Sequence, residues 1–177
     1  MNAPTSPSAP EFEVTVWLNA PGPVTLASLR GRIVAVYAFQ MLCPGCVAHA
    51  LPQAKALGQQ FRPDELAVLG LHTVFEHHEA MNERALTAFL HEYRIGFPVG
   101  VDRPGEPGPV PSTMARYGMR GTPTLLLFDR AGVLRHSLFG HSPDLQVGAL
   151  IGRLLAEAPA EATCDDGGCP LPQGRPS

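Results

Sequence analysis

Apolar and polar residues follow one another along the chain with periods that predict its secondary structure. Near-continuous apolar runs at residues 33–39 and 66–71 are typical of strands covered on both faces of a sheet. Helical spacing of apolar residues predicts helices at residues 44–60, 79–93, 112–117 and 144–155. Shorter strands are predicted at residues 12–18, 97–101, 124–128 and 133–139.

The order of these elements predicts an α/β fold with a mixed central sheet and helices on both faces. Strands and helices alternate in the first half of the chain, which implies right-handed crossovers between parallel strands. Turn-forming residues 129–132 join the last two strands into a hairpin, which adds antiparallel strands. In the closing helix we expect Leu145, Ala149, Ile151 and Leu155 to be among the residues that pack inward.

The chain divides into one domain, residues 11–156, between two tails. Residues 1–10 contain three prolines and small polar residues, and residues 157–177 have many turn formers and no periodicity. Both ends are therefore predicted to be flexible.

Composition and charge exclude several classes of function. The chain has 177 residues, is 45% hydrophobic and carries a net charge of -3. It lacks the basic excess of a nucleic-acid-binding protein, and its apolar runs are shorter than the roughly 18 residues of a membrane span. The first ten residues lack the charged and apolar regions of a secretory signal, so we expect a cytoplasmic protein.

Two close pairs of cysteines carry the candidate chemistry. Cys43 and Cys46 form a C-P-G-C motif where a buried strand leads into a helix. The N-terminus of a helix stabilises a thiolate, so we expect a lowered pKa and a nucleophilic role for Cys43. Cys46 lies one turn further on and is placed to resolve a mixed disulfide. The second pair, Cys164 and Cys169, lies in the C-terminal tail.

The sequence around this motif resembles the redoxin domains of the thioredoxin superfamily, of the TlpA/ResA-like thiol-disulfide oxidoreductase type. The similar stretches are residues 26–39 followed by C-P-G-C, and the segment YGMRGTPTL at residues 117–125. The resemblance spans about residues 12–155. It implies a thioredoxin-like fold, to which this chain adds an N-terminal strand extension and a central insertion at about residues 75–101.

The resemblance also implies a function and further site residues. It implies dithiol–disulfide exchange with a protein or small-thiol substrate, and an electron donor or acceptor protein as partner. Pro123 corresponds to the cis-proline of the family, and Thr122 before it would bind the substrate. Neither an organic cofactor nor a metal is part of this prediction.

Two residues depart from the family pattern near the cysteines. His49, three residues after Cys46, replaces a glutamate that is common in TlpA/ResA-like proteins. One helical turn separates the two residues, so His49 is a candidate catalytic proton acceptor; the alternative is a surface histidine without a role. Tyr37 stands where thioredoxin carries a buried aspartate, which leaves His49 or water as the acceptor.

The residues around the cysteine motif also bear on two competing functions. Peroxiredoxins carry Thr or Ser three residues before the reactive cysteine and Pro seven before, where this chain has Gln40 and Val36. Peroxidase activity is therefore not expected as the main function. The alternative function is a metallochaperone that binds copper or zinc through Cys43, Cys46 and a histidine, for which His72 at the end of a central strand is a candidate.

The tail cysteines have three interpretations. Cys164 and Cys169 are a possible redox relay that exchanges with Cys43 and Cys46, a pair that binds a soft metal, or thiols without a role. The acidic residues Asp165 and Asp166 between them would raise their pKa values rather than lower them.

Overall fold

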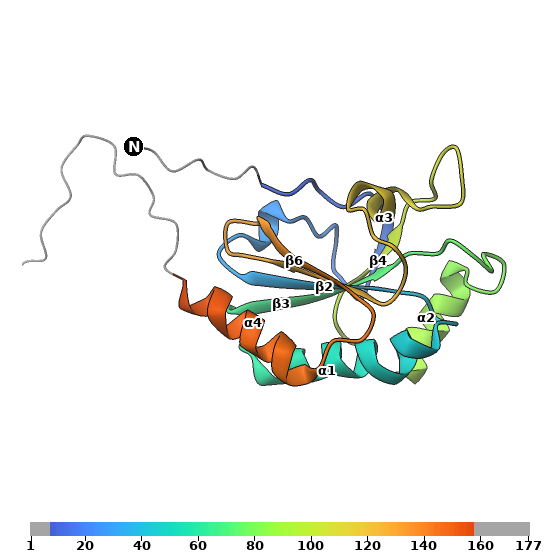
Figure 1. Ribbon diagram of the computed structural model, residues 1–177. Helices are drawn as coiled ribbons and strands as arrows, with labels where there is room; N and C mark the ends of the chain where they lie inside the picture. Colours follow the sequence, from blue (N-terminus) through green and yellow to red (C-terminus); the bar gives the residue numbers. More distant parts are fainter. Residues whose placement is uncertain (1–7, 158–177) are drawn as a thin grey trace, which may run out of the picture.

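Six strands form one sheet in the order β1-β4-β3-β2-β5-β6 (Figure 1). The structure is a computed structural model, and it describes residues 8–157. β2, β3 and β4 run parallel, while β1, β5 and β6 are antiparallel to their neighbours. The strands are β1 (Val14–Leu18), β2 (Ile33–Phe39), β3 (Leu66–His72), β4 (Val99–Asp102), β5 (Thr124–Phe128) and β6 (Leu134–Phe139).

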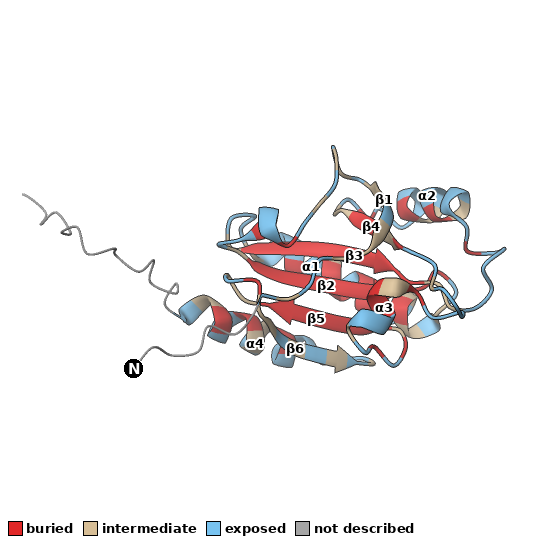
Figure 2. Cartoon of the chain, turned by 90° about the horizontal axis from the view of Figure 1, so that it is seen from above, coloured by how far each residue is buried: buried red, intermediate tan, exposed pale blue. Residues whose placement is uncertain are grey.

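Strands β2, β3 and β5 are buried along their whole length (Figure 2). β2 pairs with β3 from Ile33↔Leu66 to Phe39↔His72, and its other edge pairs with β5. Other elements cover both faces of these strands. Their sequences are therefore apolar at nearly every position.

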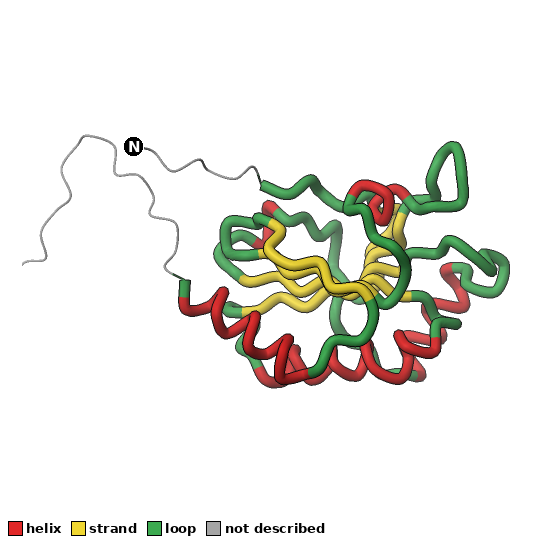
Figure 3. The backbone as a smooth tube through the Cα atoms, viewed as in Figure 1, coloured by secondary structure: helices red, strands yellow, loops and turns green. Residues whose placement is uncertain are grey.

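Helices cover both faces of the sheet (Figure 3). α1 and α4 pack on one face, and α3 and a 3₁₀ turn at Ala27–Leu29 pack on the other. α2 packs with the ends of β2 and β4 in a third apolar cluster. The helices are α1 (Leu51–Gln60), α2 (Glu83–Glu92), α3 (Ser112–Arg116) and α4 (Asp144–Ala156).

The predicted thioredoxin-like mixed sheet is confirmed, with β1 as the N-terminal extension at the sheet edge. The central region at residues 75–101 contains a loop, α2 and the first residues of β4. No helix in the described part of the chain is long and apolar enough to cross a membrane.

Two helices differ from their predicted form. The helix after the C-P-G-C motif contains a π-helical segment, Cys46–Ala50, just before Pro52 in the first turn of α1. Pro52 has no N–H for the preceding turn, and the wider π turn accommodates this loss. α2 begins at Glu83 rather than at residue 79, because the Asn82 side chain caps it by accepting a hydrogen bond from the Ala85 N–H at 3.0 Å.

The predicted inner face of α4 is confirmed for Ile151 and is wrong for Leu145 and Ala149. Leu145 is 85% exposed, and Ala149 is also exposed, whereas Val147, Ile151 and Leu154 are buried. These three residues follow the i, i+4, i+7 spacing of one helix face. Leu145 lies two positions before Val147 and therefore points away from the sheet.

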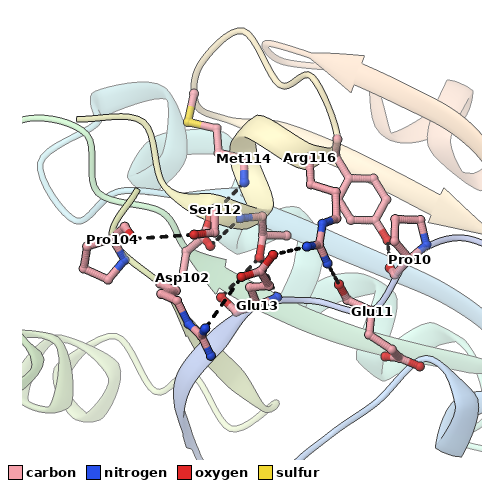
Figure 4. A network of polar contacts seen from close by, with 11 residues as sticks. Pro10, Glu11, Glu13, Asp102, Pro104, Ser112, Met114 and Arg116 are labelled. Carbon is pink, nitrogen blue, oxygen red and sulfur yellow. Dashed lines mark hydrogen bonds and ion pairs between the residues drawn. The ribbon is translucent and has the colours of Figure 1, made fainter. Parts of the chain in front are cut away.

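The N-terminal segment joins the domain earlier than predicted (Figure 4). Ala9 and Pro10, assigned to the tail, contact it: the Ala9 N–H donates to the Gly132 carbonyl at 3.0 Å, and the Tyr117 hydroxyl donates to the Pro10 carbonyl. Further along, Glu13 forms ion pairs with Arg116 and Arg103. Glu157, the first residue of the predicted C-terminal tail, pairs with Arg135. Within the predicted tails, residues 1–7 and 158–177 lie outside the described part.

Asp102, at the end of β4, holds the start of α3. Its carboxylate accepts hydrogen bonds from the Thr113 and Met114 N–H groups at 2.8 and 3.0 Å and from the Thr73 hydroxyl at 2.9 Å. Burial raises the pKa of Asp102, and these hydrogen bonds oppose the shift. The carboxylate anchors the segment that leads from β4 to Thr122 and Pro123.

His72 is a buried polar residue in the sheet. Its side chain is 1% exposed, its ring packs 5.3 Å from that of Phe39, and its Nε2 has no hydrogen-bond partner among the described residues. Burial lowers the pKa of His72 from 6.5 to about 4, because the charged imidazolium would lose its hydration. His72 is therefore neutral in the fold at neutral pH.

We predict that His72 makes the domain less stable in mild acid. The unfolded chain takes up the proton near pH 6.5, and the folded chain only near pH 4, so the free energy of unfolding falls between these values. The loss reaches about 3 kcal/mol at the acid end. Urea unfolding at several pH values checks this: His72→Leu flattens the slope and the exposed control His91→Gln keeps it. An equal slope in His72→Leu and the native chain contradicts the prediction.

Candidate functional site

Pairing of β2 with β5 brings together two segments that are distant in sequence. The C-P-G-C motif follows the end of β2, and Thr122 and Pro123 directly precede β5, whose Thr124 pairs with Ala38. The Pro123 ring lies against the motif, because a Cβ on Gly45 would lie 3.4 Å from Pro123 Cδ. The structure thus places four predicted site residues, Cys43, Cys46, Thr122 and Pro123, side by side.

The two cysteines are free thiols in different environments. Cys43 is half-buried, whereas Cys46 is fully buried. The Cys46 N–H donates to Cys43 Sγ at 3.3 Å. Cys43 Sγ also lies 3.5 Å from the Thr122 carbonyl oxygen. Only one of the two sulfurs is therefore open to a substrate.

Burial raises the pKa of Cys46 from 9.0 to about 12, and the hydrogen bond with Cys43 adds to the shift. Hydrogen bonds from the Gln40 backbone and the Thr122 side chain oppose it, because they favour the thiolate. Cys46 therefore remains a protonated thiol at neutral pH while Cys43 is beside it.

Thr122 and Pro123 form a short rigid segment. The peptide bond between them is cis. The Gly140 N–H donates to the Pro123 carbonyl at 2.8 Å, and the Thr124 hydroxyl donates to the Gly121 carbonyl at 2.7 Å. These bonds hold the segment on both sides and leave the half-buried Thr122 facing Cys43.

His49 lies on the π-helical segment and is exposed. Its ring packs against that of His141, with centroids 4.6 Å apart. His141 belongs to the loop after β6, so sequence spacing did not indicate this partner. The π-helical geometry also changes the predicted relation between His49 and Cys46, since i and i+3 residues align on an ordinary helical turn.

Tyr37 anchors a buried polar chain beneath the site. Its hydroxyl donates to Gln53 Oε1 at 2.8 Å, and Gln53 Nε2 donates to the Ser142 carbonyl at 2.8 Å and to Asp144 Oδ1 at 2.7 Å. Burial and the Asp144 carboxylate raise the pKa of Tyr37, so it stays a neutral donor. A cavity of about 10 Å³ lies between Tyr37, Gln53 and Pro123. The sequence showed only that Tyr37 replaces the buried aspartate of thioredoxin at this position.

Gln40 is a site residue that sequence reasoning missed. Its side chain is 2% exposed and contacts Thr122, Phe75 and Glu76. The signal in the sequence is a single amide at the end of an apolar strand, three residues before Cys43.

The remaining candidates are not brought together with the cysteine pair. His72 is buried beside Phe39, and within residues 8–157 no group of three or more His, Cys, Asp or Glu side chains could hold a metal ion. Cys164 and Cys169 lie outside the described residues.

Comparisons with known proteins agree with the fold. A model described as the AhpC/TSA family matches residues 6–137, so the chain belongs to this family. A crystal structure of a thioredoxin-like superfamily protein is 58% identical, with a TM-score of 0.83 over 85% of this chain and 97% of that one. A thiol-disulfide isomerase from Corynebacterium glutamicum is 45% identical, with a TM-score of 0.82 and the same shares of coverage.

A longer relative is also similar. Protein DipZ of Mycobacterium bovis is 29% identical over 154 residues, or 85% of this chain. The match is 21% of that protein, so the chain spans about a fifth of the length of its curated relatives. The predicted class is confirmed for this domain: it is a thioredoxin-superfamily redoxin domain of the thiol-disulfide oxidoreductase type. The metallochaperone alternative is not favoured.

Proposed function

We propose that Cys43 and Cys46 exchange a dithiol for a disulfide with a protein or small-thiol substrate. The observation that carries this proposal is the difference between the two sulfurs, one half-exposed beside Thr122 and one fully buried. A dithiol site that works in two steps needs this difference, because each step uses a different sulfur.

In the first step the thiolate of Cys43 attacks a substrate disulfide. A bond forms between Cys43 and one substrate sulfur, and the other substrate sulfur leaves as a thiolate. In the second step the Cys46 thiolate attacks Cys43 Sγ, so the Cys43–Cys46 bond forms and the mixed disulfide breaks. The substrate gains two electrons and takes up two protons, and the protein is left oxidised. The reverse sequence oxidises a substrate dithiol.

Thr122 and Pro123 are proposed to bind the substrate. The Cys43 sulfur lies 3.5 Å from the Thr122 carbonyl, so a substrate sulfur bonded to Cys43 would lie next to this backbone. The segment is held by hydrogen bonds from both sides, which favours a fixed geometry for the attack.

Gln40 and Val36 stand where peroxide-reducing relatives need other residues, so peroxidase activity is not proposed.

His49 is proposed as the group that takes protons from the site to water. It lies on the same helical segment as Cys46 and is exposed, so it exchanges protons readily with the solvent. An imidazole can both accept and donate a proton, which suits this task. The cytoplasmic location, the electron donor or acceptor protein and the relay through Cys164 and Cys169 stay predictions.

We expect an alkylating reagent to modify Cys43 well before Cys46. Cys46 is buried and has a pKa raised to about 12, so little thiolate is available there. Reduced protein is treated with iodoacetamide at pH 6.5, and peptide mapping measures each cysteine separately. Equal modification of Cys43 and Cys46 over time would be evidence against the assigned roles.

We predict that His49→Ala keeps the fold but loses the pH dependence of disulfide exchange near neutrality. The rate of reduction of a small disulfide is measured from pH 5.5 to 8.5. The exposed histidine His91 on α2 provides the control, and His91→Ala keeps the native profile. A His49→Ala profile that matches the native one would show that His49 has no part in proton transfer.

A further inference from the structure

We propose that Glu76 determines the substrate class of the cysteine pair: a polypeptide that carries a lysine or an arginine next to its reacting cysteine. The inference rests on the proposed dithiol exchange and names the kind of substrate that this exchange prefers. It assigns the choice to a residue of the loop between β3 and α2, outside the cysteine motif and outside the cis-proline segment.

The order of the strands places a carboxylate beside the reacting sulfur. At the end of the sheet where β2 leads to Cys43, its parallel neighbour β3 leads into the loop that contains Glu76. On the other side of β2, β5 begins shortly after Thr122, and β6 ends at Phe139. Glu76 therefore lies on the β3 side of the site, and Phe139 lies on the β6 side.

The Gln40 amide holds the Glu76 carboxylate at this position. Gln40 Oε1 accepts a hydrogen bond from the Phe75 N–H at 3.3 Å, so Nε2 is the end that donates to Glu76 Oε1, at 3.4 Å. The same nitrogen faces Thr122 Oγ1 at 3.5 Å. Gln40 is only 2% exposed, so its amide is fixed between these partners. Glu76 is itself exposed, which leaves its carboxylate open to a substrate.

Thr122 connects this carboxylate to the reacting sulfur. Cys43 Sγ lies 3.5 Å from the Thr122 carbonyl oxygen, and the Thr122 hydroxyl oxygen faces Gln40. A substrate sulfur bonded to Cys43 would lie beside Thr122, and the next residue of the substrate chain is about 3.8 Å further along. A long side chain on that neighbouring residue is therefore the group that reaches Glu76. This geometry favours a polypeptide over a small thiol.

The charges on the two sides of the site are opposite. On the β6 side, the Arg120 guanidinium lies over the Phe139 ring, 5.0 Å from its centroid. The Phe139 ring packs against the segment before Thr122, since a Cβ on Gly121 would lie 3.0 Å from it. A substrate cation is thus attracted on the Glu76 side and repelled on the other. An exposed ion pair of this kind gives a preference of about 2- to 5-fold.

A general effect of net charge is the competing explanation. Any lost carboxylate makes the protein less attractive to a cationic substrate. Glu79 provides the matched control, because it lies on the same loop, is exposed and uses only its backbone in a hydrogen bond within residues 8–157. Glu79→Gln and Glu76→Gln change the net charge equally, so a difference between them reports the position of Glu76.

Disulfide-linked dimers of three capped peptides test the inference in the full chain with Cys164→Ser and Cys169→Ser. Each peptide has one cysteine, with lysine directly before it, lysine directly after it, or glutamine on both sides. Reduced protein is mixed with each dimer at low ionic strength and quenched with acid, and mass spectrometry measures the rate of peptide thiol release. The readout is the rate with a lysine peptide divided by the rate with the glutamine peptide, so a general change in the reactivity of Cys43 cancels.

We expect Glu76→Gln to lower this ratio by about 2- to 5-fold for at least one lysine peptide, because the substrate cation loses its ion pair. Glu76→Lys lowers the ratio further, since it places a like charge at the same position. Glu79→Gln keeps the native ratio. The lysine peptide that responds also shows in which direction the substrate chain crosses Thr122.

Two results would overturn the inference: a ratio that Glu76→Gln leaves unchanged for both lysine peptides, or an equal fall of the ratio in Glu76→Gln and Glu79→Gln. A different result would contradict the proposed dithiol exchange itself, and the inference with it. That result is a protein in which none of the three dimers oxidises Cys43 and Cys46.

Discussion

The pairing of β2 with β5 is the interaction on which the site depends. It joins the end of the strand before Cys43 to the start of the strand after Pro123, with Ala38 opposite Thr124. Both strands are buried along their length, so their ladder is protected from water and from competing partners. The site thus lies where β2 ends and β5 begins. This strand pairing fixes the positions of the half-buried Cys43 and the buried Cys46.

Burial of Cys46 defines the chemistry of this site more than the spacing of the cysteines does. A sulfur without contact to water holds its proton strongly, which raises its pKa to about 12. Resolution then depends on the few groups that face the sulfur. The Gln40 backbone and the Thr122 hydroxyl favour its thiolate, and Cys43 opposes it. Once Cys43 is bonded to substrate, its sulfur no longer acts as the charged acceptor of the Cys46 S–H, so the cause by which Cys43 raises the pKa of Cys46 is removed and the balance moves toward resolution.

Much of the fold could be predicted from the sequence. The bounds of β2 and β5 agree with the predicted strands, since long apolar runs between turn residues leave few alternatives. The inner face of α4 was predicted only in part, at Ile151, because small residues and leucines lie on more than one side of that helix. The start of α2 depended on the capping side chain of Asn82.

The sequence predicted the main residues of the candidate site but not the hydrogen bonds that support them. Cys43, Cys46, Thr122 and Pro123 lie together as the family resemblance implied. The partners of Gln40 and Tyr37 could not be predicted, because each hydrogen bond joins segments that no local pattern relates: Gln40 to Thr122, and Tyr37 to Gln53. The contact between His49 and His141 could not be predicted for the same reason, since His141 lies in a loop 92 positions further along the chain.

The central claim is that burial keeps the Cys46 thiol protonated until Cys43 has reacted. Its most direct test is the ultraviolet absorbance of the thiolate as a function of pH in Cys43→Ser. Subtracting the same curve for Cys43→Ser/Cys46→Ser removes the absorbance of the tail cysteines and the tyrosines. The account predicts that Cys46 ionises well above the ordinary value of 9.0, because burial is the largest cause of its shift. Ionisation at or below 9.0 would contradict it.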